Sequence, residues 1–312
     1  MRDPVIETKN LGRSFGDVEA VKSANLSIQR GTFFGLIGPD GAGKSTTIRL
    51  LCGILKPTQG EGNVLGFNLR DNPEAIKARI GYLSQAFTLY GDLTVDENIE
   101  FFADLHGVAH FQRRRDELLA FTRLEPFHKR LAGVLSGGMK KKLALACALI
   151  HTPEILFLDE PSTGVDPVSR GEFWIILKAL LAKNITIIMT TPYLDEAERC
   201  HQIALMNAGQ IIRLDTPTAI KDTLRGRMYS VIGGSSLHDV HQILKQHWPP
   251  TALVRYGDRL HIFAARGEEE IREATAWLTQ NGQAGLQFQP IEPSLEDVFV
   301  SLMSKPQEGS HP

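Results

Sequence analysis

The sequence predicts an α/β domain followed by a smaller α+β domain. Between Ile6 and about Asp215, short apolar runs that favour strands alternate with helical patterns, which is typical of an α/β domain. After about Arg225 the apolar runs shorten and follow the order β-α-β-β-α-β, the split-βαβ or ferredoxin-like arrangement. A length of 312 residues also suits two domains. We therefore expect one domain over residues 1–225 and a second over residues 226–312.

The clearest strand patterns of the first domain lie at Phe33–Ile37, Ile155–Leu158 and Ile185–Met189. The last two lack alternation, as expected for strands that are buried on both faces. A helix is expected at Thr46–Ile54, after a glycine-rich turn. Charged helical patterns between Asp92 and Arg130 predict a helical insertion in the α/β core, over about residues 88–135.

The elements expected in the second domain are short. Strands are predicted at Met228–Ile232, Ala252–Tyr256, Arg259–Phe263 and Leu286–Ile291, and helices at Leu237–Trp248, Glu268–Thr279 and Leu295–Met303. The two middle strands should form a hairpin about the two-residue turn Gly257-Asp258. Ser304–Pro312 is a polar tail with two prolines, which we expect to be disordered.

Composition excludes several classes of protein. The 34 basic and 36 acidic residues give a net charge of −2, so the overall charge does not draw the chain to nucleic acid. The three cysteines form no CxxC pair, which suits a reducing cytosol better than a disulfide framework. Met1–Asn10 lacks the apolar stretch of a signal peptide, and the most apolar region, Leu143–Leu158, is too short to span a bilayer. We therefore expect a cytoplasmic protein with at most a peripheral membrane role.

A glycine-rich loop follows the first predicted strand. Gly38-Pro39-Asp40-Gly41-Ala42-Gly43-Lys44-Ser45 fits the phosphate-binding pattern GxxxxGK[ST], and a predicted helix follows it. The glycines allow consecutive backbone N–H groups to converge on phosphate oxygens at the start of that helix. Lys44 should reach the terminal phosphates and Ser45 should bind Mg²⁺. The predicted nucleotide site therefore includes Gly38 to Thr46, with the unusual acid Asp40 pointing away from the phosphates.

Two acidic residues follow the apolar run Ile155–Leu158. Asp159 would hold the Mg²⁺ shell, through water, and Glu160 would orient or deprotonate an attacking water. The alternative is that both acids only solvate the end of a strand. Together with Lys44, they predict phosphoryl transfer to water.

Leu135-Ser136-Gly137-Gly138-Met139 resembles the LSGGQ signature of the ATP-binding cassette (ABC) ATPases. The resemblance implies that Ser136, Gly137 and Gly138, at a helix N-terminus, bind the γ-phosphate of ATP held by the opposite subunit of a dimer. Met139 replaces the usual glutamine, a variant associated with drug-exporter-like members. The basic run Lys140-Lys141-Lys142 that follows would add positive potential near the phosphate.

Further family elements occur in the expected order over Val5 to about Asp215. Phe15 is similar to the aromatic residue that stacks on adenine, because stacking needs only a ring face. Gln85 matches the glutamine that ligates Mg²⁺ and senses the membrane subunit, and Asp166 matches the D-loop residue that communicates across the dimer. The resemblance implies catalytic roles for Lys44, Gln85 and Glu160, and metal ligation by Ser45, Gln85 and Asp159.

One position departs from the family pattern. In Thr190-Thr191-Pro192-Tyr193, the family's switch histidine should stand at Pro192. Proline has no side-chain donor, so it cannot bond the γ-phosphate or the catalytic water as a histidine does. We expect a site that hydrolyses ATP slowly beside a second ATPase subunit with an intact histidine, which favours a heterodimer over a homodimer. The alternative is that a neighbouring group or water replaces the histidine.

Glu292–Phe299 is similar to the PSLEDVF segment that closes the accessory domain of ATPases in ABC-2-type drug and polysaccharide exporters. The resemblance implies an ATP-hydrolysing exporter subunit at the cytoplasmic face of the inner or plasma membrane, with ATP and Mg²⁺ as cofactors. An integral membrane permease would contact Gln85–Asn98 and the helical insertion. Two alternatives remain: a regulatory ATP-binding subunit with little turnover, and a soluble ABC ATPase of DNA repair or translation, which would need a coiled-coil insertion or a second cassette.

Overall fold

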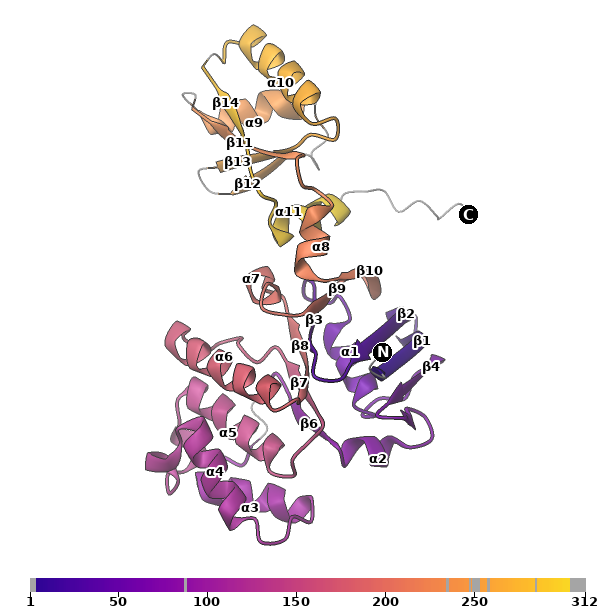
Figure 1. The fold of residues 1–312 in the computed structure, drawn as a ribbon, viewed down its shortest axis with the longest axis vertical. Helices are drawn as coiled ribbons and strands as arrows, with labels where there is room; N and C mark the ends of the chain where they lie inside the picture. Colours follow the sequence, from indigo (N-terminus) through magenta and orange to yellow (C-terminus); the bar gives the residue numbers. More distant parts are fainter. Residues whose placement is uncertain are drawn as a thin grey trace. The chain divides into compact units, whose positions relative to one another are not determined.

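The computed structural model forms two compact units, Met1–Leu214 and Asp215–Pro312, which are considered separately (Figure 1). It describes residues 4–86, 89–233, 236–246, 248, 253–256, 259–283 and 285–303. The division comes earlier in the chain than the boundary expected at residue 225. The reason is that helix α8 (Pro217–Asp222) packs on α11 (Leu295–Met303), near the other end of the second unit.

A six-stranded sheet forms the centre of the first unit, in the order β10-β9-β3-β8-β7-β6. Its strands are β3 (Phe33–Ile37), β6 (Ile80–Leu83), β7 (Ile155–Asp159), β8 (Thr186–Thr191), β9 (Gln202–Asn207) and β10 (Gln210–Asp215). The pairs β9–β3, β3–β8, β8–β7 and β7–β6 are parallel. All residues of β3, β7 and β8 are buried, which explains why the predicted strands at β7 and β8 showed no alternation.

Helices cover both faces of this sheet. Phe34 and Leu36 belong to the same buried cluster as Ile48 of α1 (Lys44–Leu51), whereas Phe33 contacts Trp174 of α6 (Pro167–Ala182) with ring centroids 5.6 Å apart. Successive residues of a strand point to opposite faces, so β3 anchors both layers. The short helix α7 (Leu194–Ala197) follows β8.

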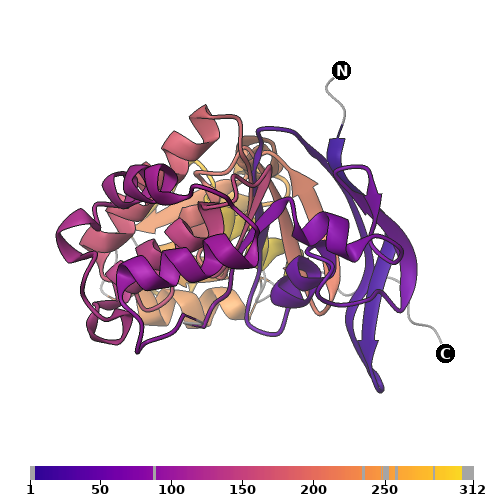
Figure 2. The same cartoon turned by 90° about the horizontal axis from the view of Figure 1, so that it is seen from below.

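An antiparallel sheet packs beside α1, and the sequence analysis did not predict it. Its strands are β1 (Pro4–Phe15), β2 (Val18–Gln29), β4 (Gln59–Val64) and β5 (Phe67–Asn68), in the order β2-β1-β4-β5. Figure 2 shows its indigo strands on the opposite side of the first unit from the magenta helices. The helix α2 (Pro73–Lys77) then leads to β6.

Helices fill most of the stretch for which an insertion was predicted, although its expected start at residue 88 lies outside the described residues. They are α3 (Val95–Leu105), α4 (Gln112–Thr122), two 3-10 turns (Glu125–Phe127 and Ala132–Val134) and α5 (Gly137–Leu149). Thr94 and Glu97 form a capping box that starts α3. Lys142 of α5 and Arg123, at the end of α4, both pair with Glu172 of α6. These ion pairs join the helical region to the core.

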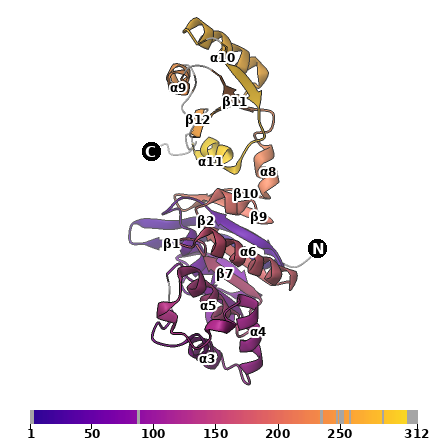
Figure 3. The same ribbon diagram turned by 90° about the vertical axis from the view of Figure 1, so that its left-hand side faces the viewer.

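The second unit has the element order β-α-β-β-α-β after α8. It consists of β11 (Met228–Ile232), α9 (Leu237–Lys245), β12 (Leu253–Tyr256), β13 (Arg259–Phe263), α10 (Glu268–Gln280), β14 (Gln287–Pro290) and α11. The sheet is antiparallel in the order β12-β13-β11-β14, with α9 and α10 on one face and α11 on the other (Figure 3). The predicted turn Gly257-Asp258 and the predicted disordered tail Ser304–Pro312 lie outside the described residues.

The segment that resembles PSLEDVF forms a helix cap joined to the sheet. Ser294 and Asp297 bond to each other's backbone N–H groups at the start of α11, in the manner of a capping box. Asp297 is buried and its Oδ1 lies 3.1 Å from Nδ1 of His261 on β13. The motif therefore holds α11 against the sheet.

A stacked pair of histidines lies between α3 and the end of α5. The rings of His106 and His151 are parallel with centroids 3.8 Å apart, and His151 Nε2 lies 2.9 Å from the Ile80 carbonyl oxygen. Burial, and then the charge of His106, lower the pKa of His151 to about 4. Lys77 and Tyr82 also line the small cavity beside this pair. His151 is therefore neutral at pH 7.

We expect His151 to make the first unit less stable in acid. Its folded pKa of about 4 lies below the ordinary value of 6.5, so the unfolded chain binds the proton more tightly. The stability contributed by the neutral ring is complete above about pH 6.5 and is lost as the pH falls towards 4. Urea unfolding at pH 7 and pH 5 should show a smaller loss for His151→Gln than for the wild type. The exposed control His110→Asn should lose as much stability as the wild type, and equal losses in all three proteins would contradict the assignment.

Candidate functional site

A cavity of about 580 Å³ lies where the glycine-rich loop meets the carboxyl ends of β7 and β8. Parallel strands direct their carboxyl ends to one edge of a sheet, which is where ligands bind in such folds. The lining residues come from distant parts of the chain: Phe15, Ala20, Asp40 to Thr46, Gln85, Glu160, Thr163, Pro192 and Tyr193.

The glycine-rich loop turns tightly between β3 and α1. Gly43 has φ +99°, and a side chain there would overlap the Ala20 carbonyl oxygen, so only glycine fits. Lys44 is 4% exposed, and its Nζ donates to the carbonyl oxygens of Gly38 at 2.9 Å and Pro39 at 3.1 Å. The loop thus curls around the ammonium group of its own lysine.

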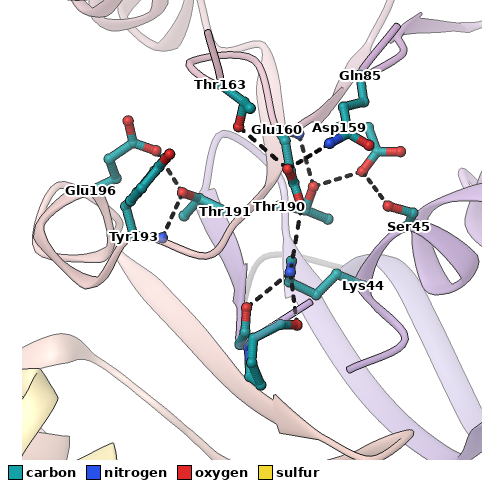
Figure 4. A network of polar contacts seen from close by, with 12 residues as sticks. Lys44, Ser45, Gln85, Asp159, Glu160, Thr163, Thr190, Thr191, Tyr193 and Glu196 are labelled. Carbon is teal, nitrogen blue, oxygen red and sulfur yellow. Dashed lines mark hydrogen bonds and ion pairs between the residues drawn. The ribbon is translucent and has the colours of Figure 1, made fainter. Parts of the chain in front are cut away.

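Asp159 is fully buried at the end of β7. Its Oδ1 accepts hydrogen bonds from Ser45 Oγ and Thr190 Oγ1, each at 2.8 Å (Figure 4). Its Oδ2 lies 3.5 Å from Tyr82 Oη. Burial raises the pKa of Tyr82, so its hydroxyl keeps the proton that it directs at the carboxylate. Ser45 and Asp159, which were predicted to share a metal ion, therefore lie side by side. Hydroxyl and carboxylate oxygens are the ligand types that Mg²⁺ prefers.

Glu160 is the centre of a second set of contacts. Only 6% of the residue is exposed, and its Oε2 accepts hydrogen bonds from Gln85 Nε2 at 2.8 Å and Thr163 Oγ1 at 3.3 Å. Its Oε1 lies 3.4 Å from Lys44 Nζ. The backbone of Glu160 has φ +46°, a strained left-handed conformation for a residue with a side chain. Such strain at a buried carboxylate with three polar partners is typical of functional sites.

Of the other predicted residues, Phe15 and the loop from Asp40 onward line the cavity, whereas Gly38 and Pro39 do not. Phe15 is 46% exposed, and the Arg13 guanidinium lies 4.7 Å from its ring centroid. One face of the ring is thus covered by a cation, and exposed ring area remains for stacking. Asp40 is exposed but lines the cavity, as does Thr46.

Ser136, Gly137 and Gly138 do not line this cavity. Ser136 caps α5 by accepting a hydrogen bond from the Met139 N–H at 3.3 Å, and Ser136 and Gly137 are exposed. A side chain at Gly138 would overlap Ser169, so this glycine is needed for packing α5 on α6. Within one chain, the signature and the phosphate loop are therefore separate surfaces.

Pro192 lines the cavity directly after β8, where a histidine was expected from the family pattern. Its neighbours are fixed by hydrogen bonds, because Thr191 Oγ1 accepts from the Tyr193 N–H at 3.0 Å and donates to buried Glu196 at 2.7 Å. The Arg170 guanidinium lies 5.5 Å from the Tyr193 ring centroid. The backbone is thus held where a switch residue would stand, without a donor at that position.

Three residues that the sequence patterns did not indicate complete the site. Thr190 bridges Asp159 and Glu160, Tyr82 lies beside Asp159, and Thr163 bonds Glu160. The available signal was their position: Thr190 directly follows the predicted strand Ile185–Met189, and Tyr82 and Thr163 lie three residues before Gln85 and Asp166. None of them carries a motif of its own.

Comparison with known proteins identifies the family. Residues 21–163 match the family described as ABC transporter. Nod factor export ATP-binding protein I of Bradyrhizobium diazoefficiens is 34% identical over 311 residues, which cover 99% of this chain and 99% of that protein. The chain belongs to the ATP-binding proteins of ABC transporters.

A second curated relative and a solved structure are also similar to this ABC ATP-binding protein. "Probable multidrug ABC transporter ATP-binding protein YbhF" of Escherichia coli K12 is 40% identical over 313 residues, which are 97% of this chain and 53% of that protein. The chain thus spans about half the length of YbhF. A solved dimer of an ATP-binding cassette with ADP and Pi bound is 27% identical with a TM-score of 0.62, and the match covers 68% of this chain and 98% of that one. Of the helices in the described residues, none is long and apolar enough to cross a membrane.

We expect Thr190→Val to lower the free energy of unfolding of the first unit of this ABC ATP-binding protein. The substitution keeps the shape but leaves the buried Glu160 N–H without its acceptor and Asp159 Oδ1 with Ser45 as its remaining donor, at a cost of about 1–3 kcal/mol. Urea unfolding of the first unit would measure the loss. Thr218→Val, the same change at an exposed position of α8, should leave unfolding unchanged. Equal stability of both variants would contradict the bridging role of Thr190.

Proposed function

We propose that this chain is the ATP-binding and hydrolysing subunit of an ABC-type membrane exporter, in which ATP-driven dimer closure drives a membrane permease. The observation that carries the proposal is the convergence of Lys44, Ser45, Gln85, Asp159 and Glu160 beside one cavity. Each contributes the chemistry that its motif requires. A chance glycine turn would not bring these groups together.

The nucleotide would lie along the cavity from Phe15 to the glycine-rich loop. The exposed ring of Phe15 offers a stacking surface for adenine. Residues from Gly38 to Thr46 would hold the phosphates, with backbone N–H groups at the start of α1 and the ammonium group of Lys44 as donors. Gly41 and Gly43, both at positive φ, let that backbone approach the phosphates.

Ser45 and Asp159 would hold a Mg²⁺ ion, because their oxygens are 2.8 Å apart and both are hard ligands. When bound, the ion supplies positive charge that neutralises the phosphate oxygens. Gln85 would complete this shell through its amide oxygen, since its amide nitrogen already donates to Glu160.

Glu160 would orient or deprotonate the water that attacks the terminal phosphate. Gln85 and Thr163 hold one carboxylate oxygen, while the other faces Lys44. Catalysis in phosphoryl transfer consists mainly of positioning and charge stabilisation. Gln85, Thr163 and Lys44 fix the position of the Glu160 carboxylate. Lys44 would exchange its loop carbonyl partners for phosphate oxygens.

Two subunits would enclose two nucleotides, each bound between the Lys44 loop of one subunit and Ser136 to Gly138 of the other. The exposure of Ser136 and Gly137, away from the chain's own cavity, supports this arrangement. A similar cassette has been solved as a dimer with ADP and Pi. We favour a heterodimer, because Pro192 cannot supply the donor that a switch histidine gives.

The permease would contact the segment Gln85–Asn98 and the helical region behind it. Tyr90 and Phe101 are 46% and 39% exposed with ring centroids 4.8 Å apart, which supports an apolar contact there. The subunit would be peripheral at the cytoplasmic face of the membrane, without a nucleic-acid partner. Relatives named for multidrug transport, Nod factor export and linearmycin resistance support efflux as the direction of transport.

The second unit would be a ferredoxin-like accessory domain for regulation or subunit contact. Its β-α-β-β-α-β order and the sheet order β12-β13-β11-β14 support this assignment. The buried bond between Asp297 and His261 gives the PSLEDVF-like segment a structural role within that domain.

We expect Glu160→Gln to abolish turnover while leaving ATP binding intact. The variant keeps the shape and one oxygen that can accept from Gln85 and Thr163, but it removes the base, so phosphate release should fall at least about 100-fold. The dissociation constant of a fluorescent ATP analogue should stay within about threefold. Glu74→Gln, at an exposed position of α2, should match the wild type. ATP binding without hydrolysis in the wild-type complex would favour the regulatory alternative.

We expect Pro192→His to raise turnover of the purified chain about tenfold, because it restores a donor beside the terminal phosphate. Phosphate release at saturating ATP measures the effect, first with this chain alone and then in the complex assembled with its permease. An unchanged rate would contradict the impaired-site hypothesis. Another residue or water would then supply the missing donor.

A further inference from the structure

Lys141, in the middle of the basic run after the signature, makes a contact that the proposed mechanism does not use. Its Nζ donates to the backbone carbonyl oxygen of Gln85 at 2.7 Å and lies 3.5 Å from that of Ser84. Lys141 belongs to α5, whereas the Gln85 segment (residues 83–86) begins at the last residue of β6. One side chain thus joins two motifs that are more than fifty residues apart in the sequence.

The surroundings of Lys141 are not those of a solvated surface lysine. The residue is half-buried, and burial lowers the pKa of its ammonium group, while attraction to Asp159 and Glu160 acts in the opposite direction. Both catalytic-site carboxylates are therefore within electrostatic reach. A charged donor to a carbonyl oxygen makes a stronger hydrogen bond than a neutral one.

The contact continues directly to Glu160. The carbonyl that Lys141 holds is that of Gln85, and the side-chain amide of the same residue donates to Glu160 Oε2 at 2.8 Å. Ser136 caps the start of α5 and lies five residues, or about 7.5 Å along the helix axis, before Lys141. Two hydrogen bonds therefore separate the signature helix from Glu160.

We infer that Lys141 is a positioning residue that holds the Gln85 segment against the signature helix and thereby sets the orientation of Gln85 towards Glu160. The inference rests on the proposed ATPase function for its kinetic consequence. In that setting, movement of α5 when Ser136 engages the partner's nucleotide changes the Gln85 contact to Glu160 in this subunit. Lys141 then links one nucleotide site to the other.

The neighbouring Lys142 provides a contrast within the same helix. Lys142 is 7% exposed, and its ammonium group pairs with Glu172 of α6. It therefore fastens α5 to the core and makes no described contact with the Gln85 segment. A variant of Lys142 should loosen the whole helix. A variant of Lys141 should release only the Gln85 segment.

The first experiment is hydrogen exchange of the backbone amides at residues 83–86 in the full chain, which needs no turnover. Lys141→Met should speed this exchange about tenfold, with exchange in α6 and the thermal midpoint unchanged. Lys141→Arg, which keeps a charged donor, should restore protection. Lys178→Met, at an exposed position of α6, is the control for loss of a lysine charge. Unchanged protection of residues 83–86 in Lys141→Met would overturn the inference.

The second experiment measures phosphate release in a double-mutant cycle. Lys141→Met should lower kcat about tenfold with KM unchanged, and should have no further effect in a Gln85→Ala background, because both changes remove the same support of Glu160. Additive losses would overturn the inference. If the wild type binds ATP without turnover, the proposed function fails, and the hydrogen-exchange result still decides the role of Lys141.

Discussion

The hydroxyl of Thr190 holds the site together by bonding two consecutive acidic residues. It donates to Asp159 at 2.8 Å and accepts from the backbone N–H of Glu160 at 2.9 Å. Asp159 and Thr190 are paired directly in the parallel register of β7 and β8, so the sheet itself delivers the hydroxyl to this point. The left-handed turn at Glu160 would otherwise leave its backbone N–H unpaired, and the Thr190 hydroxyl supplies the acceptor. A slip of one residue between these strands would remove the bridge, because it would turn the side chain to the other face.

The parts of the site that could be predicted from sequence are those whose chemistry is local. The glycine-rich loop and the Asp159-Glu160 pair each consist of residues that are close in the sequence, between a strand and a helix. Their sequence patterns were therefore sufficient to predict them. Other contacts join residues that lie 30 to 77 positions apart in the sequence. They are the bonds of Thr190 to Asp159 and Glu160, of Tyr82 to Asp159, and of Gln85 to Glu160. These contacts depend on the strand order β8-β7-β6, and no periodicity in the chain specifies which strands are neighbours.

The fold was predictable to a similar extent. Buried parallel strands appear as uninterrupted apolar runs, and β3, β7 and β8 were found at or within a few residues of the expected positions. The antiparallel sheet was missed because β1 pairs with β2 and β4 through several register shifts, which break the alternation that predicts a half-buried strand. In the second unit, strands of four or five residues kept their pattern because few irregularities interrupt them.

The basic run Lys140-Lys141-Lys142 illustrates why composition alone says little about a charge cluster. Successive residues of a helix point about 100° apart, so neighbouring lysines reach different elements. Lys141 bonds the Gln85 carbonyl oxygen, and Lys142 is buried against Glu172, whose carboxyl pKa is lowered by that bond. The helix is thus fastened on two sides near its middle, while Ser136 and Gly137 at its start are exposed. A force applied at that exposed end acts on a helix held at two fixed points. At one point, Lys142 binds Glu172 in the core. At the other, Lys141 binds Gln85, which in turn donates to Glu160 beside the cavity.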